Sequence, residues 1–115
     1  RSEQTVENRT SAEELRRSAF RRNNRIVLQT INVMREDYTP LESVADALEN
    51  TIELADVTDC VNYLTESGYI KLRIRGTQTN VTDLADAEFS QLGAKLTAKG
   101  IQFLNGKIDD PCIRR

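Results

Sequence analysis

The stretch that most constrains the fold runs from residue 56 to 75, because two hydrophobic periods follow each other there. The first part repeats apolar residues at i, i+3, i+4 and i+7, the spacing of one helix face. These residues are Val57, Cys60, Val61 and Leu64. Asp56 is suited to cap this helix and Gly68 to end it. Beyond Gly68, apolar residues alternate with cations, which predicts a strand with one buried and one solvated face. The alternating residues are Ile70, Lys71, Leu72, Arg73, Ile74 and Arg75.

A first helix is predicted from about residue 11 to 36. Ser11 and Glu14 have the spacing of a capping box, in which each side chain bonds the backbone of the other's turn. The polar interval 22–25 allows either one long helix or a split one. The ten residues before it are polar apart from Val6 and are expected to form a flexible arm.

A second helix is predicted after Thr39, the expected cap, with Pro40 at the first helical position and Glu42 completing the capping box. Its apolar residues recur at helical spacing, and Asn50 is an expected end. The turn 51–55 has a length typical of the link between the two helices of a helix-turn-helix.

The remainder of the chain reads as a β-hairpin and a closing helix. Residues 76–80 are rich in turn formers, 81–90 are expected to be an extended loop, and 91–96 a returning strand. Thr97 is placed to cap a short last helix that ends at Gly106. Residues 107–115 are expected to be a C-terminal tail.

These elements together predict a mainly α-helical domain with a small antiparallel β wing. A helix that turns at a glycine into an amphipathic strand is how a winged helix-turn-helix passes from its recognition helix into its wing. The expected domain therefore covers residues 11–106, with an N-terminal helical extension. Leu48, Val61, Leu64, Ile70 and Leu72 are expected to be buried.

Charge is segregated along the chain. Residues 1–35 carry a net charge of +4, residues 36–70 carry −9 and residues 71–115 carry +3, which gives −2 for the whole chain. The acidic block coincides with the predicted helix-turn-helix. The exposed face of its recognition helix includes Thr58, Asn62 and Tyr63, of which only Asn62 and Tyr63 suit base contacts, beside acids that would stand near the phosphates. Conventional docking of this helix into the major groove is therefore disfavoured.

Two basic surfaces are the candidates for nucleic-acid contact. Five arginines crowd the early first helix, and three cations share the solvated face of the wing strand. They are Arg16, Arg17, Arg21, Arg22 and Arg25, and Lys71, Arg73 and Arg75. Either set suits phosphate or minor-groove contact. The alternative is a purely structural role for each surface. The outward cations of the strand would discourage pairing at the strand edge. The arginines of the helix would balance the charge of the acidic block, within one chain or across a dimer.

No catalytic or cofactor site is expected. The chain has no histidine and no glycine-rich phosphate loop, and its two cysteines have no metal-ligand spacing. No stretch reaches the roughly 20 apolar residues of a membrane span, and none has the form of a signal peptide. A cytoplasmic, non-enzymatic protein without cofactors or small-molecule substrate is expected.

Several segments resemble small winged-helix proteins encoded in Mu-like prophages. The segment DVTDCVNYLTESGYIKLRI, the step from Leu96 to Gly100 (LTAKG), and Asp110, Pro111 and Ile113 carry this resemblance. The resemblance spans about residues 26–113 and implies a winged-helix fold and a phage-derived, bacterial origin. It brings no assigned activity, so no functional residue is carried over from it.

The sequence supports two functional hypotheses. The first is association with duplex DNA through the basic wing and the arginine-rich helix, by a homodimer. The second is a protein-interaction or dimerisation module whose acidic helix-turn-helix face binds a basic partner, such as the arginine-rich helix of another copy.

Overall fold

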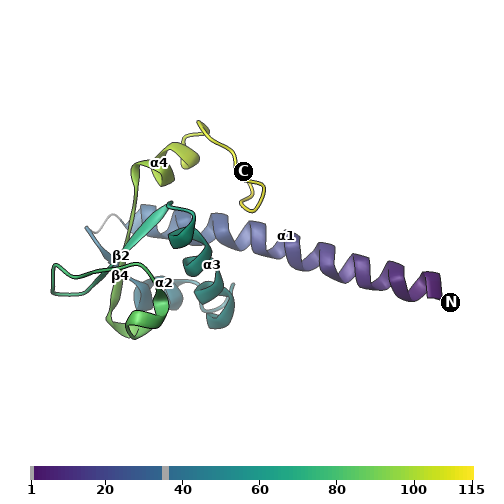
Figure 1. The fold of residues 1–115 in the computed structure, drawn as a ribbon, viewed down its shortest axis with the longest axis horizontal. Helices are drawn as coiled ribbons and strands as arrows, with labels where there is room; N and C mark the ends of the chain where they lie inside the picture. The colour runs from purple at the N-terminus through teal and green to yellow at the C-terminus, as the bar shows by residue number, and fades with distance from the viewer. Residues whose placement is uncertain (1, 35–36) are drawn as a thin grey trace.

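The computed structural model describes residues 2–34 and 37–115. Over this part of the chain it contains four α-helices, two short 3-10 helices and one antiparallel sheet of four strands (Figure 1). In chain order they are α1 (Ser2–Met34), β1 (Thr39–Pro40), α2 (Leu41–Ala47), α3 (Leu54–Glu66), β2 (Ile70–Ile74), β3 (Asn80–Val81), η1 (Leu84–Asp86), η2 (Phe89–Gln91), β4 (Leu92–Leu96) and α4 (Ala98–Leu104). The expectation of several helices with a small antiparallel sheet is confirmed.

The first helix is longer than expected. It begins at Ser2 and not at Ser11, so the segment predicted as a flexible arm continues the helix over residues 2–10. It also runs unbroken through the polar interval 22–25. Residues 2–34 contain neither glycine nor proline, so no residue interrupts the hydrogen-bond ladder. The predicted end at residue 36 lies outside the described residues.

Two predicted helix caps are wrong. Thr39 lies in β1 opposite Ala94, and the cap position of α2 is Pro40. The buried hydroxyl of Thr39 has no hydrogen-bond partner among the described residues. In α3 the cap position is Glu53, and Asp56 lies within the first turn. At neither helix start does the side chain at the cap position accept a hydrogen bond from the first turn. At α2, the pairing of residues 39–40 with β4 takes precedence over the local capping signal.

The predicted turn at Gly68 is confirmed. Gly68 has a φ of 83°, which a residue without a β-carbon adopts without strain. Its amide donates to the carbonyl of Thr65 (3.1 Å), and the amide of Tyr69 donates to that of Leu64 (2.9 Å). This pair of bonds is a Schellman motif, which satisfies the last carbonyls of a helix. The motif sends the chain from α3 directly into β2.

The sheet has the order β1-β4-β2-β3, with every neighbouring pair antiparallel. The predicted turn at 76–80 and the predicted returning strand at 91–96 are confirmed, since β2 turns through Gly76 (φ 75°) and β4 returns beside it. The segment 81–90 was predicted as an extended loop, but it contains η1 and the start of η2. Its first residue, Val81, is buried against β2.

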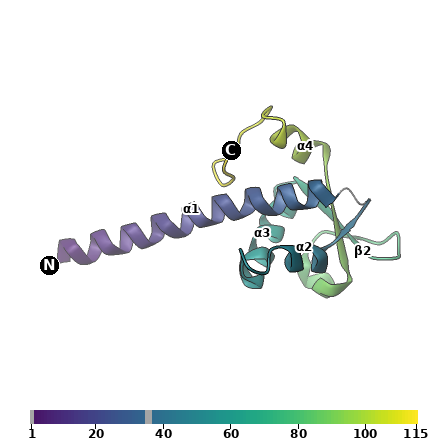
Figure 2. The same ribbon diagram turned by 180° about the vertical axis from the view of Figure 1, so that it is seen from behind.

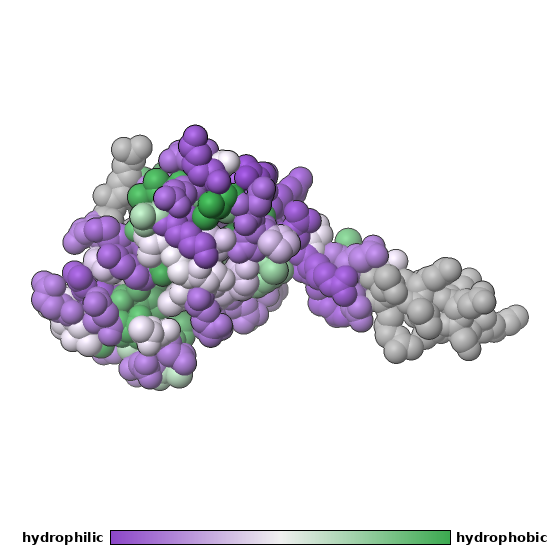
Figure 3. Space-filling view, turned by 45° about the horizontal axis from the view of Figure 1, so that its top comes forward, coloured by the Kyte–Doolittle hydropathy of each residue, from purple (hydrophilic) through white to green (hydrophobic). Residues whose placement is uncertain are grey.

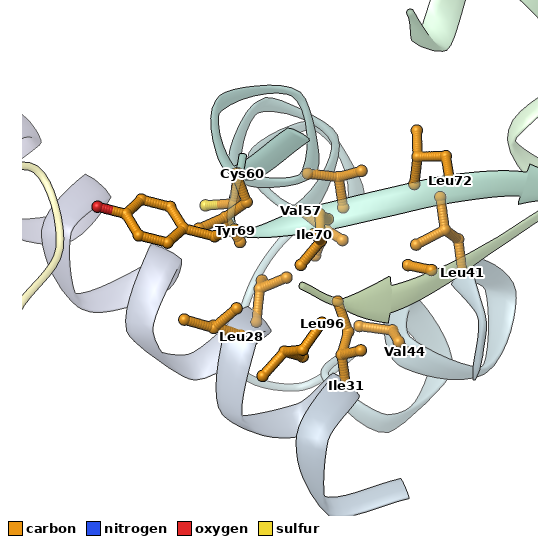
Figure 4. Packing of buried hydrophobic residues seen from close by; sticks show 14 of the residues in the cluster. Leu28, Ile31, Leu41, Val44, Val57, Cys60, Tyr69, Ile70, Leu72 and Leu96 are labelled. Carbon is orange, nitrogen blue, oxygen red and sulfur yellow. The ribbon is translucent and has the colours of Figure 1, made fainter. Parts of the chain in front are cut away.

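One hydrophobic core lies between the helices and the inner face of the sheet. Figure 4 shows Leu28 and Ile31 of α1 lying near Ile70 of β2 and Leu96 of β4. The five residues predicted to be buried are each 7% exposed or less. On the closing helix, a β-carbon at Gly100 would lie 2.3 Å from the carbonyl oxygen of Tyr69, so only glycine lets α4 pack this closely on the start of β2.

The C-terminal segment packs on the domain. The predicted cap at Thr97 is confirmed, since its hydroxyl accepts a hydrogen bond from the amide of Gly100 (3.2 Å), and Gly106 ends α4 with a φ of 76°. The residues that follow fold back along α1 (Figure 2). The amide of Arg114 donates to the carbonyl of Arg21 (3.0 Å), and Ile113 is only 2% exposed.

Candidate nucleic-acid interface

The register of the sheet gathers cations on its outer face. Directly opposite residues in antiparallel strands share a face, so Lys71 of β2 lies beside Lys95 of β4. Arg73 is opposite Gly93 on one side and opposite Asn80 on the other. Arg75 continues the same row and is exposed. The three cations predicted on the solvated face of the wing strand therefore point away from the core, and a fourth, Lys95, joins them.

Tyr38 lies on this face, in contact with Arg73. The guanidinium carbon of Arg73 is 4.2 Å from the centroid of the Tyr38 ring, and Nζ of Lys95 is 5.9 Å from it. Gly93 makes room for the tyrosine, because a β-carbon there would lie 3.0 Å from Cβ of Tyr38. A guanidinium stacked on an aromatic ring loses little freedom when it binds an anion, since its orientation is already fixed.

The outer face also has a hollow at its edge. A shallow pocket of about 290 Å³ is lined by Asp37, Tyr38, Pro40 and residues 73–77. Asp37 pairs with Lys95 (Oδ1 to Nζ, 3.1 Å). Among residues 11–34 and 37–115, no carboxylate lies within 4.0 Å of the charged groups of Lys71, Arg73 or Arg75. We call Lys71, Arg73, Arg75 and Lys95, with Tyr38, the wing face.

The arginines of α1 do not join the wing face. In Figures 1 and 2 the turn after β2 and the N-terminus of α1 point toward opposite ends of the molecule. Arg17 pairs with Glu13 one turn away (3.3 Å), and Arg25 donates to the carbonyl of Arg114 (3.5 Å). Arg21 and Arg22 are exposed. One copy of the chain therefore presents two separate basic surfaces.

Arg16 faces the acidic block. It lines a shallow pocket of about 300 Å³ between α1 and α3, together with Asp56 and Asp59. Asn23, which is 7% exposed, lines the same pocket, and its side-chain oxygen has no hydrogen-bond partner among the described residues. The floor of the pocket is apolar. Ala19, Phe20 and Cys60 form it. Arg16, Asp56 and Asp59 thus line one pocket, although no ion pair within 4.0 Å joins Arg16 to either carboxylate.

The exposed face predicted on α3 is only partly available. Asn62 is exposed, and Thr58 donates its hydroxyl to the carbonyl of Leu54 (2.9 Å). Tyr63 is half-buried, because its ring packs edge-on against Phe20 (5.5 Å between centroids) and its hydroxyl donates to Asp110 (2.8 Å). The prediction that Tyr63 lies on the exposed face is therefore wrong, because its side chain packs on Phe20 and binds Asp110.

Asp110 is a polar centre that the sequence analysis missed. Its carboxylate accepts hydrogen bonds from the hydroxyls of Tyr63 and Tyr69 and from the amide of Cys112, each at 2.8 Å. Tyr69 in turn packs on Phe103 (5.7 Å between centroids). Only the local bond to Cys112 follows from sequence spacing. The tyrosines lie 41 and 47 residues away, and no spacing rule connects them. We call this arrangement the tail clasp.

The tail clasp perturbs the acidity of its members. Burial of Tyr69, together with its hydrogen bond to Asp110, raises its pKa to about 12. Burial and the same carboxylate raise the pKa of Tyr63 as well. For Asp110, burial favours the neutral acid, but the hydrogen bonds from Cys112, Tyr63 and Tyr69 outweigh it and lower the pKa. The clasp is therefore built for an ionised Asp110 and neutral tyrosines.

No metal or thiol chemistry is apparent in the part of the chain that the structure describes. It contains no group of three or more potential metal-ligating side chains. The thiol of Cys60 is fully buried, which raises its pKa to about 12 and suits an inert core residue. Within the described helices, none is both long and apolar enough to cross a membrane.

Comparisons with protein-family models, with curated proteins and with solved structures found no match for this chain. Its function is therefore inferred from the geometry of its own residues.

Proposed function

We propose that this chain is a winged helix-turn-helix protein of the Mu-like prophage type that binds the phosphate backbone of duplex DNA through its wing face. The order of elements supports the fold: a helix, a short strand, two helices joined by a turn, and a hairpin whose returning strand β4 pairs with both β1 and β2. In this reading α2 and α3 are the helix-turn-helix, and β2, β3 and β4 with their loops are the wing.

The observation that carries the proposal is a like-charged pair on the wing face. Lys71 and Lys95 stand directly opposite each other on adjacent strands, an arrangement that is destabilising unless an anion lies between them. Asp37 reaches only Lys95. Arg73 and Arg75 extend the row. A phosphate backbone supplies a line of anions that such a row of cations fits.

Binding of this kind depends on salt and not on base sequence. Phosphate contacts release counterions, so affinity falls as salt rises, by a slope of about 0.9 in log–log terms for each contact. Acids remain exposed on α3, including Asp59 and Glu66. They disfavour entry of that helix into the major groove, where bases are read. We therefore propose backbone binding without sequence preference.

The test is fluorescence anisotropy of a labelled duplex at several salt concentrations. We expect binding at low salt, and we expect the double variant Arg73→Ala/Arg75→Ala to reduce the salt slope by about 1.8, for two lost phosphate contacts. Arg21→Ala/Arg22→Ala is the matched control, since it removes the same charge from exposed positions of α1. A larger effect of this control would assign binding to α1, and no binding at low salt by the wild-type chain would end the proposal.

A second candidate function follows from the pocket between α1 and α3. Its two carboxylates, from Asp56 and Asp59, are acceptors beside apolar side chains, and Arg16 lines the same pocket. The buried side-chain oxygen of Asn23, which has no hydrogen-bond partner among the described residues, is a further acceptor. This combination suits the stem and head of an arginine or lysine side chain. We propose, as the alternative to DNA binding, that the acidic helix-turn-helix face binds a basic protein partner here.

Calorimetric titration with an arginine-rich peptide tests this alternative. We expect saturable binding that Asp56→Asn/Asp59→Asn weakens at least fivefold, by loss of one or two charge-assisted hydrogen bonds of roughly 1.5–3 kcal/mol each. The control is Glu42→Gln/Glu49→Gln, which removes the same charge from exposed positions in and after α2. Equal weakening by both pairs would indicate diffuse attraction to the acidic block and would count against a pocket.

A further inference from the structure

The N-terminal half of α1 projects away from the rest of the molecule (Figures 1 and 2). The chain measures 57 × 32 × 25 Å along its principal axes, and this helix accounts for the long dimension. The side chains of residues 11–18 are all exposed, whereas packing on the core begins near Phe20. Figure 3 shows the described part of this projection as mainly hydrophilic.

A helix that projects without support needs a source of stability. Most helical stability in proteins comes from packing of an apolar face. The projection carries such a face: Ala12, Leu15 and Ala19 recur at i, i+3 and i+7. Leu15 is 71% exposed. A leucine this exposed on a projecting helix, with small residues on either side, has the form of a helix-pairing contact.

Charge along the projection identifies the occupant and its direction. Residues 3–14 hold four glutamates and Arg9, a net charge of −3, and residues 16–25 hold five arginines and no acid, a net charge of +5. The boundary between the two halves falls at Leu15. A parallel second copy would align like charges, whereas an antiparallel copy aligns each acidic half with a basic half. The helix is therefore complementary to itself in one orientation only.

We propose that α1 pairs with α1 of a second copy in antiparallel orientation, crossing near Leu15. A two-fold axis through this point relates the copies, so each presents the same surface to the other. The pairing buries Leu15 between the flanking alanines and brings Glu13 and Glu14 of each projection against the arginines of the partner. This inference does not depend on DNA binding. It is tested by the mass of the assembly and by the distance between the N-termini of its two copies.

The first measurement is the mass of the full chain by sedimentation at low salt. We expect twice the 13.0 kDa of one chain for the wild type and a single chain mass for Leu15→Glu. Val33→Glu is the matched control, because Val33 is also on α1 and also 71% exposed but lies at the far end of the helix. A monomeric wild type at high protein concentration, or a dimer indifferent to Leu15→Glu, overturns the proposal.

The second measurement tests orientation. Spin labels at Ser2→Cys, in a Cys112→Ser background that leaves only the buried Cys60, report the distance between the two N-termini. With 1.5 Å of rise per residue and a crossing at residue 15, we expect about 40 Å in the antiparallel pair. A parallel pair would give about 10 Å, and that result rejects the proposed arrangement.

The third measurement reverses charge. Glu13→Arg/Glu14→Arg places arginines where the partner's arginines lie in the antiparallel pair, so we expect the dimer dissociation constant to rise at least tenfold at low salt. In a parallel pair the same change would relieve repulsion between glutamates. An unchanged or tighter dimer therefore contradicts the proposed charge pairing.

Discussion

Replacing Leu64 by alanine is expected to lower the free energy of unfolding by about 2–5 kcal/mol, the range for large-to-small changes at well-packed core sites. Leu64 is fully buried on the inner face of α3, and it belongs to the cluster that joins α1, α3 and the sheet. The cavity left by three missing carbon atoms lies under the Schellman turn, where Tyr69 fixes the direction of β2. The surroundings therefore have little freedom to collapse into it.

Urea denaturation followed by circular dichroism measures this loss. An unchanged slope of the unfolding free energy with urea shows that the variant unfolds from the same compact state. Asn62→Ala, an exposed change on the same helix, is the control and is expected to alter stability by no more than about 0.5 kcal/mol. A loss below about 1 kcal/mol for Leu64→Ala would mean that this face of α3 is not packed in a core.

The junction at Gly68 was predictable from sequence because each of its signals is local. The helical period, the left-handed glycine and the alternating strand all act within about twenty residues, and they agree with one another. The capping signals failed for the opposite reason. Thr39 has the residue type of a cap, but its backbone pairs with β4, a strand more than fifty residues later in the chain. A long-range pairing displaced a local preference worth about 1 kcal/mol.

The wing face was half predictable. Alternation along one strand indicates that Lys71, Arg73 and Arg75 share a side, and the structure bears this out. Lys95 and Tyr38 come from other segments, and only the register of β4 and the missing side chain at Gly93 bring them to the same surface. Strand register depends on contacts between segments far apart in sequence. The residues that lie opposite a strand therefore cannot be predicted from the sequence of that strand alone.

The packing of the tail was not predictable from composition, which describes solvation only on average. Asp109 and Asp110 look alike in a polar segment, yet Asp109 is exposed and pairs with Arg115, whereas Asp110 meets two tyrosine hydroxyls. The polar interval 22–25 in α1 also has a role in holding the tail. Asn24 is fully buried and donates to the carbonyl of Cys112 (2.9 Å), so the asparagine receives the returning tail.

Neutralising Asp110 is expected to release the tail from the domain. In Asp110→Asn the hydroxyls of Tyr63 and Tyr69 lose a charged acceptor, and hydrogen bonds to charged groups contribute about 1.5–3 kcal/mol each. We expect the free energy of unfolding at neutral pH to fall by about 2–4 kcal/mol, since the amide oxygen still accepts one bond. Asp109→Asn, the same change one residue earlier and at an exposed site, is expected to alter stability by less than about 1 kcal/mol.

The pH dependence of this loss identifies the clasp. The pKa of Asp110 is lowered on folding, so its contribution is fully present above the unfolded value of about 3.9 and is lost as pH falls through the lower folded value. The pKa of Tyr69 is raised to about 12, so its contribution is fully present below an unfolded value of about 10 and is lost as pH rises through about 12. The stability difference between wild type and Asp110→Asn should therefore be level between about pH 5 and 9.

Urea denaturation of both chains from pH 2 to 9 measures that difference, and using the difference cancels the titration of the other acids, which both chains share. We expect the difference to shrink steadily below about pH 4. The Tyr69→Phe variant keeps the ring that packs on Phe103 but lacks the hydroxyl, so a cycle with Asp110→Asn isolates one hydrogen bond. Additive losses in that cycle, or a difference that persists unchanged at pH 2, would show that Asp110 holds the tail by something other than its charge.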